Sequence, residues 1–410
     1  MKFFQYFILI LFTFFSINAK SQVILIEKVY DFDLKMIESL WTKNKVPQFI
    51  APINFGVDVY KIIYQTKWID DSQISASGLY YVPKSINPLP TLIYHHGTRV
   101  LKKRVNKIKG ENIISMIFAT DGYAVIAPDY IGLGDGEKEH LYCNVESEAI
   151  AAIDFLKVID EVNKTINRKR NEKLFLTGYS QGGHATMSTH MVLERDYRDL
   201  YTVTASSPMS GPYDIYDTQS KVMYSSYEQP HYLPYLLIGL NTAYDIWPKK
   251  EFFSNFKSPY DTIIPRLFDG KNNIRKINQV LPKIPIQMLE DSLLIEYHRD
   301  PNFILHKYLQ LNNIFDWKPE APVQLCYCKS DQEVLYENSI LAYNTMKKNG
   351  ANNISLKSSG NKFNHQKCAG FATIYSKFYF DSYRKESKRL RKGPFFKRAA
   401  LNLQKLLSTN

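Results

Sequence analysis

From about residue 57, short apolar runs alternate with stretches of helical hydrophobic spacing, and this alternation constrains the fold more than any other feature. It is typical of βαβ units and predicts a mostly parallel, eight-stranded α/β sheet flanked by helices. The strands are predicted at 57–65, 75–83, 90–95, 123–128, 173–178, 202–207, 322–327 and 353–357, with the first two antiparallel. Helices are predicted at 110–120, 145–162, 181–195, 337–349 and 367–388.

The alternation stops between Gly211 and Pro322, where a Tyr- and Pro-rich segment contains helical pieces. This segment is too long for an ordinary loop between two strands, so we expect an inserted domain. The chain of 410 residues is long enough for one large core carrying such an insertion. The predicted organisation is a core at 23–211 and 321–388, interrupted by a helical cap at 212–320.

Residues 1–22 resemble a secretory signal peptide. One lysine precedes an apolar run from Phe7 to Phe15, and small and polar residues follow around Ala19 and Ser21. The alternative is a membrane-anchoring helix, but the run is shorter than the roughly 20 residues that span a bilayer. We expect an exported protein, periplasmic or secreted, cleaved near Ala19 or Ser21.

The formal net charge of +12 is concentrated towards the C-terminus, in the basic tail at 389–410 and the residues just before it. An exported chain without a recognition motif is not expected to bind nucleic acid, so the tail indicates an anionic surface or solubility. Residues 395–407 place apolar side chains on one helical face. They could form an interfacial membrane helix or pack on their own domain, and peripheral membrane contact is one expectation.

A nucleophile motif lies at Gly178-Tyr179-Ser180-Gln181-Gly182, between an apolar strand and a helical pattern. G-x-S-x-G in this context places the serine on a strained strand-to-helix turn, and the flanking glycines Gly178 and Gly182 relieve the crowding. The helix N-terminus beneath it favours developing negative charge. Ser180 is the predicted nucleophile.

A serine nucleophile needs a base and an orienting carboxylate, which in this arrangement follow in the order Ser, acid, His. Asp331 ends the apolar strand in VQLCYCKSDQEV, and His365 lies in a polar loop before the last predicted helix. These are the predicted acid and base. Glu333 is a weaker alternative for the acid.

The chain at His95-His96-Gly97-Thr98 follows a strand and precedes the first crossover helix, where a second oxyanion donor belongs. We assign the oxyanion hole to the backbone amides of Gln181 and Thr98. A metal site at the two histidines lacks a carboxylate or third histidine at ligand spacing, so neither a metal nor a cofactor is expected.

These residues resemble the α/β-hydrolase superfamily and, within it, the bacterial and fungal secretory lipases and esterases. The matching segments are HHGT (95–98), GYAVIAPDYIGLGDG (122–136), GYSQGGHA (178–185), SDQEV (330–334) and NHQKCAG (364–370). The resemblance implies an α/β-hydrolase fold with a helical cap and a serine hydrolase that cleaves small-molecule esters or lipids through an acyl-enzyme. Its rivals are a serine peptidase of the same fold and a non-catalytic binding protein on a hydrolase scaffold.

The four cysteines suit an oxidising compartment, but their pairing is open. Cys328 precedes the predicted acid by three residues, and Cys368 follows the predicted base by three. If the two loops meet over Ser180, a disulfide between these cysteines would hold acid and base in register. Two buried thiols are the alternative.

Overall fold

The computed structural model describes residues 22–103 and 108–384. The predicted signal peptide, apart from Gln22, and the predicted basic tail at 389–410 therefore lie outside the described residues. Among the helices that are described, none is long and apolar enough to cross a membrane.

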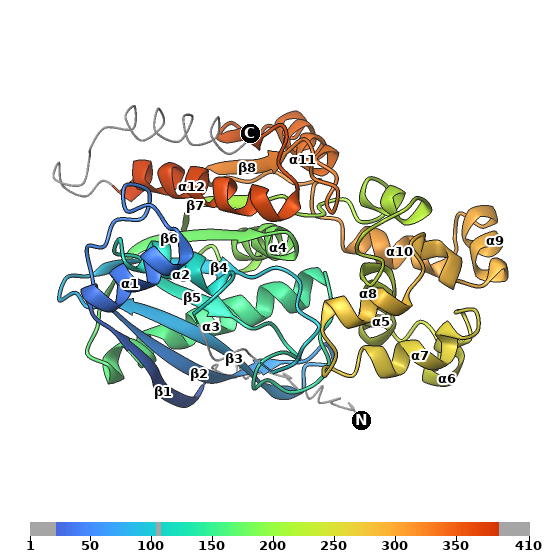
Figure 1. Ribbon diagram of the computed structural model, residues 1–410, viewed down its shortest axis with the longest axis horizontal. Helices are drawn as coiled ribbons and strands as arrows, with labels where there is room; N and C mark the ends of the chain where they lie inside the picture. The colour runs from blue at the N-terminus through green and yellow to red at the C-terminus, as the bar shows by residue number, and fades with distance from the viewer. Residues whose placement is uncertain (1–21, 104–107, 385–410) are drawn as a thin grey trace, which may run out of the picture.

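A nine-stranded sheet forms the centre of the molecule, in the order β1-β2-β3-β5-β4-β6-β7-β8-β9 (Figure 1). The six strands from β5 to β9 in this order pair in parallel, whereas β1, β2 and β3 pair antiparallel and join the sheet through an antiparallel β3–β5 contact. The strands are β1 (Val23–Phe32), β2 (Val57–Lys67), β3 (Gln73–Pro83), β4 (Leu89–His95), β5 (Ala124–Pro128), β6 (Arg170–Tyr179), β7 (Val203–Met209), β8 (Val323–Cys328) and β9 (Ile354–Gly360).

The expected α/β fold and the antiparallel pairing of the first two predicted strands are confirmed, but the expected count of eight strands was wrong. The additional strand is β1, which runs along β2 with Ile26 opposite Ile62 and Phe32 opposite Val57. No residue of β1 is fully buried, because it is an edge strand. Its sequence, VILIEKVYDF, has neither clean alternation nor a wholly apolar run, so periodicity alone did not reveal it.

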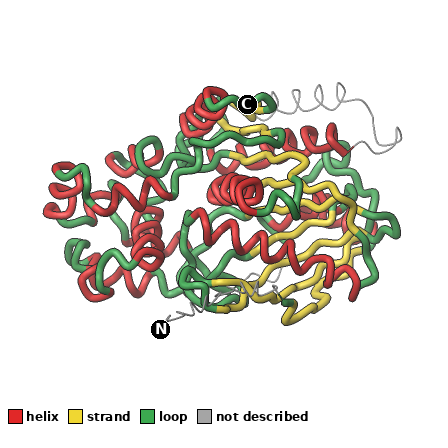
Figure 2. The backbone as a smooth tube through the Cα atoms, turned by 180° about the vertical axis from the view of Figure 1, so that it is seen from behind, coloured by secondary structure: helices red, strands yellow, loops and turns green. Residues whose placement is uncertain are grey.

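Helices cover both faces of the sheet (Figures 1 and 2). Apolar residues of α3 and α4 pack on one face with those of β2 and β3, and α11 covers β8 and β9 beside α4. Residues of α1, α2 and α12 pack on the other face. These helices are α1 (Leu34–Asn44), α2 (Asn112–Ala119), α3 (Val145–Thr165), α4 (Gln181–Asp196), α11 (Glu337–Lys348) and α12 (His365–Arg384).

The last helix is fixed to the sheet by a buried ionic network. Lys377 of α12 is fully buried and pairs with Asp121 and with Asp381, the latter at 2.9 Å. Arg384 donates a hydrogen bond of 2.8 Å to the backbone carbonyl of Asp121. Because His365 is the first residue of α12, this network anchors the far end of the helix that carries the predicted base.

Between β7 and β8 the chain forms a helical segment that lies to one side of the sheet (Figure 1). It has an apolar cluster of its own, built from residues such as Leu240, Phe256 and Ile277. Its elements are η1 (Gln219–Tyr224), α5 (Tyr232–Tyr244), α6 (Lys249–Phe253), α7 (Tyr260–Leu267), α8 (Ile274–Val280), η2 (Pro285–Met288), α9 (Asp291–Arg299) and α10 (Ile304–Leu311). We call this segment the cap.

The cap contacts the loops that follow the strands. Tyr235 donates a hydrogen bond of 2.9 Å to the carbonyl of Arg99, after β4. Tyr227 donates one of 2.6 Å to the carbonyl of Glu333, after β8. The cap therefore lies at the carboxyl ends of the parallel strands, where ligands bind in open α/β sheets.

Candidate active site

Ser180 lies at the tight turn between β6 and α4. Its backbone angles, φ 61° and ψ −122°, are outside the helical and strand regions and are strained for a residue with a side chain. The turn also presses against β4, since a Cβ on Gly182 would lie 2.0 Å from the carbonyl oxygen of His95. Glycine is therefore required beside Ser180, as the motif predicted.

Two backbone amides near Ser180 are available to an oxyanion. Gln181 is the first residue of α4, so its amide has no acceptor within the helix. The Thr98 amide donates no hydrogen bond to any residue that the structure describes, whereas the amide of Gly97 is bonded to Glu111 Oε2 at 2.9 Å. The arrangement suits the predicted oxyanion donors Gln181 and Thr98.

Asp331 and His365 are in direct contact. The His365 Nδ1 lies 2.9 and 2.8 Å from the two carboxylate oxygens of Asp331. The Asp331 Oδ1 also accepts the backbone amides of Glu333 and Val334, both at 3.0 Å. Asp331 is thus fixed by its own loop and in turn orients the imidazole, which is the role of the acid in a triad.

Burial opposes the charged form of His365, but the hydrogen bond and charge of Asp331 outweigh it and raise the pKa of the imidazole. Glu333 and Glu111 act in the same direction. A positively charged imidazole is therefore stabilised at this position.

Glu333, the alternative acid, faces the other ring nitrogen. Its Oε2 lies 3.9 Å from His365 Nε2, and the side chain is buried. Since Asp331 holds Nδ1, Asp331 fits the orienting role better than Glu333 does.

Sequence reasoning missed a contact made by Tyr179, the residue before Ser180. Its hydroxyl donates a hydrogen bond of 2.6 Å to the backbone carbonyl of His365, and its ring lies 4.7 Å from the imidazole. Tyr179 thus brings the base loop against the Ser180 turn. The Ser180 hydroxyl itself bonds no residue that the structure describes, and the contacts of a catalytic base often tighten only when substrate is bound.

A disulfide joins the end of β8, just before the loop that carries Asp331, to the first turn of α12, which begins at His365. Cys328, at the end of β8, bonds Cys368, in the first turn of α12. Cys143 and Cys326 are buried free thiols.

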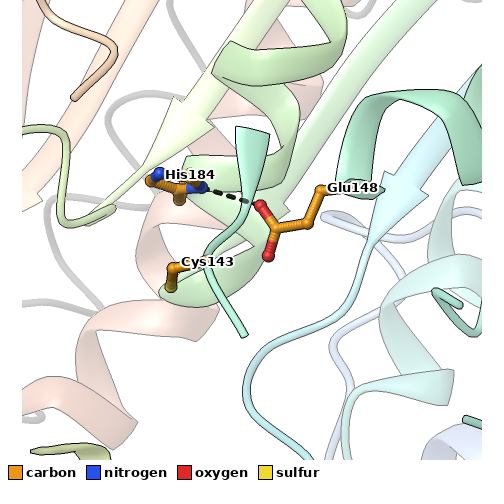
Figure 3. A group of neighbouring side chains, drawn as sticks. All are labelled: Cys143, Glu148 and His184. Carbon is orange, nitrogen blue, oxygen red and sulfur yellow. Dashed lines mark hydrogen bonds and ion pairs between the residues drawn. The ribbon is translucent and has the colours of Figure 1, made fainter. Parts of the chain in front are cut away.

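The side chains of Cys143, Glu148 and His184 form a buried cluster (Figure 3). His184 Nδ1 pairs with Glu148 Oε2 at 2.7 Å, and its Nε2 lies 3.0 Å from the carbonyl of Asn312. The other oxygen of Glu148 accepts the Gln181 side chain at 2.8 Å. Burial raises the pKa of the Cys143 thiol well above its usual range. Because His184 and Glu148 pair with each other and Glu148 also accepts the Gln181 side chain, the cluster holds Gln181 at the start of α4.

A pocket opens at Ser180 and is lined mainly by apolar and aromatic residues, with Glu333 among them. A second, larger pocket lies within the cap and is lined by leucines of α5, α9 and α10. The two pockets share Ile215, Gln219, Met223 and Leu236. The space beside Ser180 therefore adjoins an apolar chamber in the cap.

No protein-family description and no curated protein matches the sequence. Solved structures do match: a candidate hydrolase from Legionella pneumophila has 29% sequence identity and a TM-score of 0.81, covering 90% of this chain and 100% of its own. The rice cell wall degrading esterase LipA from Xanthomonas oryzae has 23% identity and a TM-score of 0.79, covering 88% and 99%. Candida antarctica lipase A in its closed state has 15% identity and a TM-score of 0.66, covering 89% and 82%.

Proposed function

We propose that this chain, which has the α/β-hydrolase fold that these esterases and lipases share, is an exported serine hydrolase that cleaves carboxylic esters. The observation that carries the proposal is the Asp331–His365 pair, which Tyr179 connects to the strained strand-to-helix turn of Ser180. Similarity to the esterases and lipases supports ester hydrolysis as the reaction class.

In the proposed mechanism, Nε2 of His365 takes the proton from Ser180 as the hydroxyl attacks the ester carbonyl. Asp331 holds the imidazole at Nδ1 and stabilises its positive charge. The amides of Gln181 and Thr98 stabilise the oxyanion. His365 then protonates the leaving alcohol, and water, activated by the same imidazole, releases the acid from Ser180.

The apolar chamber in the cap supports an acyl chain as the bound part of the substrate. Its lining includes Leu233, Leu237, Leu293 and Leu305, and it adjoins the pocket at Ser180 through shared residues. Burying each methylene of an acyl chain there contributes about 0.8 kcal/mol. A chain of several carbons would therefore bind better than acetate.

The test is hydrolysis of p-nitrophenyl acetate, butyrate and palmitate by the purified mature protein. We expect turnover that rises from acetate to butyrate and falls by at least about a thousandfold in Ser180→Ala. Ser382→Ala, which removes an exposed hydroxyl of α12, is the matched control and should keep full activity. Equal turnover in Ser180→Ala would exclude the serine mechanism. Hydrolysis of peptides but of no ester would favour a peptidase. If neither esters nor peptides were hydrolysed, a non-catalytic binding protein would be favoured.

We base the proposals of export and membrane contact on the sequences of the N-terminal segment and the basic C-terminal tail. The N-terminal segment predicts cleavage near Ala19 or Ser21, which N-terminal sequencing of the exported protein would detect. The basic tail predicts salt-sensitive binding to anionic vesicles, which deletion of 389–410 should abolish.

A further inference from the structure

The pocket at Ser180 is lined by the carboxyl side chain of Glu333. Among the described residues that form this pocket, Glu333 is the only acidic or basic one, and its neighbours there include Tyr142, Ile215 and Leu236. Its side chain is 6% exposed and lines the pocket, so the carboxyl group is largely shielded from bulk solvent. An acidic side chain is seldom buried in an apolar pocket without a group to pair with it.

The cap holds Glu333 in place. Its carboxylate oxygens accept the Tyr232 hydroxyl at 3.2 Å and the Gln229 amide at 3.3 Å. Its backbone carbonyl accepts Tyr227 at 2.6 Å and Gln219 at 2.9 Å. The residue is therefore fixed by four hydrogen bonds from one side, and its carboxylate cannot turn away from the pocket without breaking two of them.

The carboxylate keeps acceptor capacity towards the substrate. A carboxylate accepts about four hydrogen bonds, and the cap supplies two, both of them long. The remaining lone pairs lie in a pocket whose walls offer mostly carbon atoms. A donor on a bound molecule would satisfy them.

The position of Glu333 identifies which part of the substrate it meets. Its Oε2 lies 3.9 Å from Nε2 of His365, the atom that must protonate the leaving oxygen. Glu333 lines the pocket at Ser180 but not the apolar chamber in the cap. The carboxylate is therefore beside the leaving alcohol, while the acyl chain extends into the chamber.

We propose that Glu333 selects the leaving group, favouring esters of alcohols that carry a hydrogen-bond donor, either a hydroxyl or an ammonium, two carbons from the ester oxygen. The inference rests on the proposed ester hydrolysis and names the substrate class within it. Glu333 acts here as a specificity residue, and Asp331 remains the partner of His365 in proton transfer.

The test compares pairs of butyrate esters of the same shape. The first pair is 2-hydroxyethyl and propyl butyrate; the second is 2-(dimethylamino)ethyl butyrate, protonated at neutral pH, and 3-methylbutyl butyrate. We expect kcat/KM to favour the donor-bearing member of at least one pair by about tenfold, and Glu333→Gln to reduce that preference at least about fivefold. The pair that responds distinguishes a hydroxyl from an ammonium.

The ratio of kcat/KM within each pair reports recognition of the donor. A loss of proton transfer would lower kcat/KM of both members equally and leave the ratio unchanged. Glu337→Gln makes the same chemical change on an exposed residue of α11, and we expect it to keep the wild-type ratios. Ratios that are equal in the wild type and in Glu333→Gln would overturn the proposal even if every ester is hydrolysed.

A second measurement needs no turnover. Ser180→Ala protein is titrated by calorimetry with N-(2-hydroxyethyl)butanamide, N-propylbutanamide, N-[2-(dimethylamino)ethyl]butanamide and N-(3-methylbutyl)butanamide. A donor-bearing amide should bind about fivefold more tightly than its isostere, and adding Glu333→Gln should remove the difference. Equal affinities within both pairs, or failure of all four amides to bind, would overturn the assignment of Glu333. Hydrolysis of p-nitrophenyl butyrate, compared between the wild type and Ser180→Ala, tests the proposed esterase activity separately from the role of Glu333.

Discussion

At the scale of single residues, His365 is surrounded by carboxylates on more than one side. Asp331 contacts Nδ1 and Glu333 lies near Nε2, while Glu111 acts from the neighbouring loop after β4. Burial favours the neutral imidazole, yet these charges raise its pKa above the ordinary value of 6.5. A general base must be neutral to accept a proton.

The acid limb of the kcat/KM profile should therefore have its midpoint above pH 6.5, with activity rising as pH increases through it. Glu333→Gln removes one carboxylate from this group, so the midpoint should move to lower pH. The measurement is p-nitrophenyl butyrate hydrolysis from pH 5 to 9, and Glu337→Gln should leave the profile unchanged. A midpoint at or below 6.5 in the wild type would contradict the electrostatic interpretation.

Spacing predicted Ser180, Asp331 and His365, because the order of nucleophile, acid and base follows the order of the strands. The structure places Asp331 against His365, and the catalytic roles stay predictions until they are tested. The contacts of Tyr179 and the placement of Glu333 could not be predicted. They depend on where two loops and the cap meet, which no local pattern encodes.

At the scale of elements, the disulfide connects the end of β8 to the start of α12 across 40 residues. Because these two positions flank the acid and the base, the bond limits how far the two loops can separate. Cys328→Ser with Cys368→Ser should lower the free energy of unfolding by about 3 kcal/mol. It should also lower kcat more than it raises KM, since positioning of the imidazole is affected.

Urea unfolding and p-nitrophenyl butyrate kinetics would measure both effects. Cys326→Ser is the control, since Cys326 is a buried thiol outside the disulfide. An unchanged stability and kcat in the double variant would show that packing alone holds the two loops.

The ionic network of α12 supports a second prediction about an element. Lys377→Met removes the buried ammonium that pairs with Asp121 and Asp381 and leaves Arg384, at 3.7 and 3.9 Å from them, as a cation near both. Removing one partner of a buried ion pair costs about 3–5 kcal/mol. We expect a loss of this size in urea unfolding, part of which Asp121→Asn should restore in the double variant. Lys348→Met, at the exposed end of α11, should change stability little. Equal losses in the two lysine variants would rule out a specific role for the network.

Most strands and helices of the core were predictable because buried parallel strands are continuous apolar runs and their helices keep a regular spacing. The edge strand β1 was not, since solvent reaches both of its faces and its sequence shows no clear period. The helices of the cap were only partly predictable, because several are short and one, α7, contains Pro265.

At the scale of the whole molecule, several histidines are buried in surroundings that disfavour their charged form. Burial lowers the pKa of His95 and His231 to about 3, and it also lowers the pKa of His96 and His140. Below pH 6.5 the unfolded chain takes up protons that the folded protein cannot. Stability is therefore present above pH 6.5 and is lost as the pH falls.

Each such histidine lowers the free energy of unfolding by about 1.4 kcal/mol for every pH unit below its pKa in the unfolded chain. The raised pKa of His365 has the opposite effect. We expect the free energy of unfolding to fall by about 3–5 kcal/mol between pH 7.5 and 5.5. Urea titrations at the two pH values would measure this. A constant free energy across this range would mean that these histidines are protonated in the folded protein.

The chain leaves the sheet after β7 and returns in β8, which pairs directly with β7 through Ser206–Val323 and Met209–Cys326. The sheet is therefore continuous without the cap, and evolution could exchange this insertion as a module. Gln219 and Tyr227 nevertheless hold the backbone of Glu333, whose amide bonds Asp331. A replacement cap would have to supply equivalent hydrogen-bond donors to the backbone of Glu333. A cap that changed the substrate range without them would disturb the loop that holds Asp331.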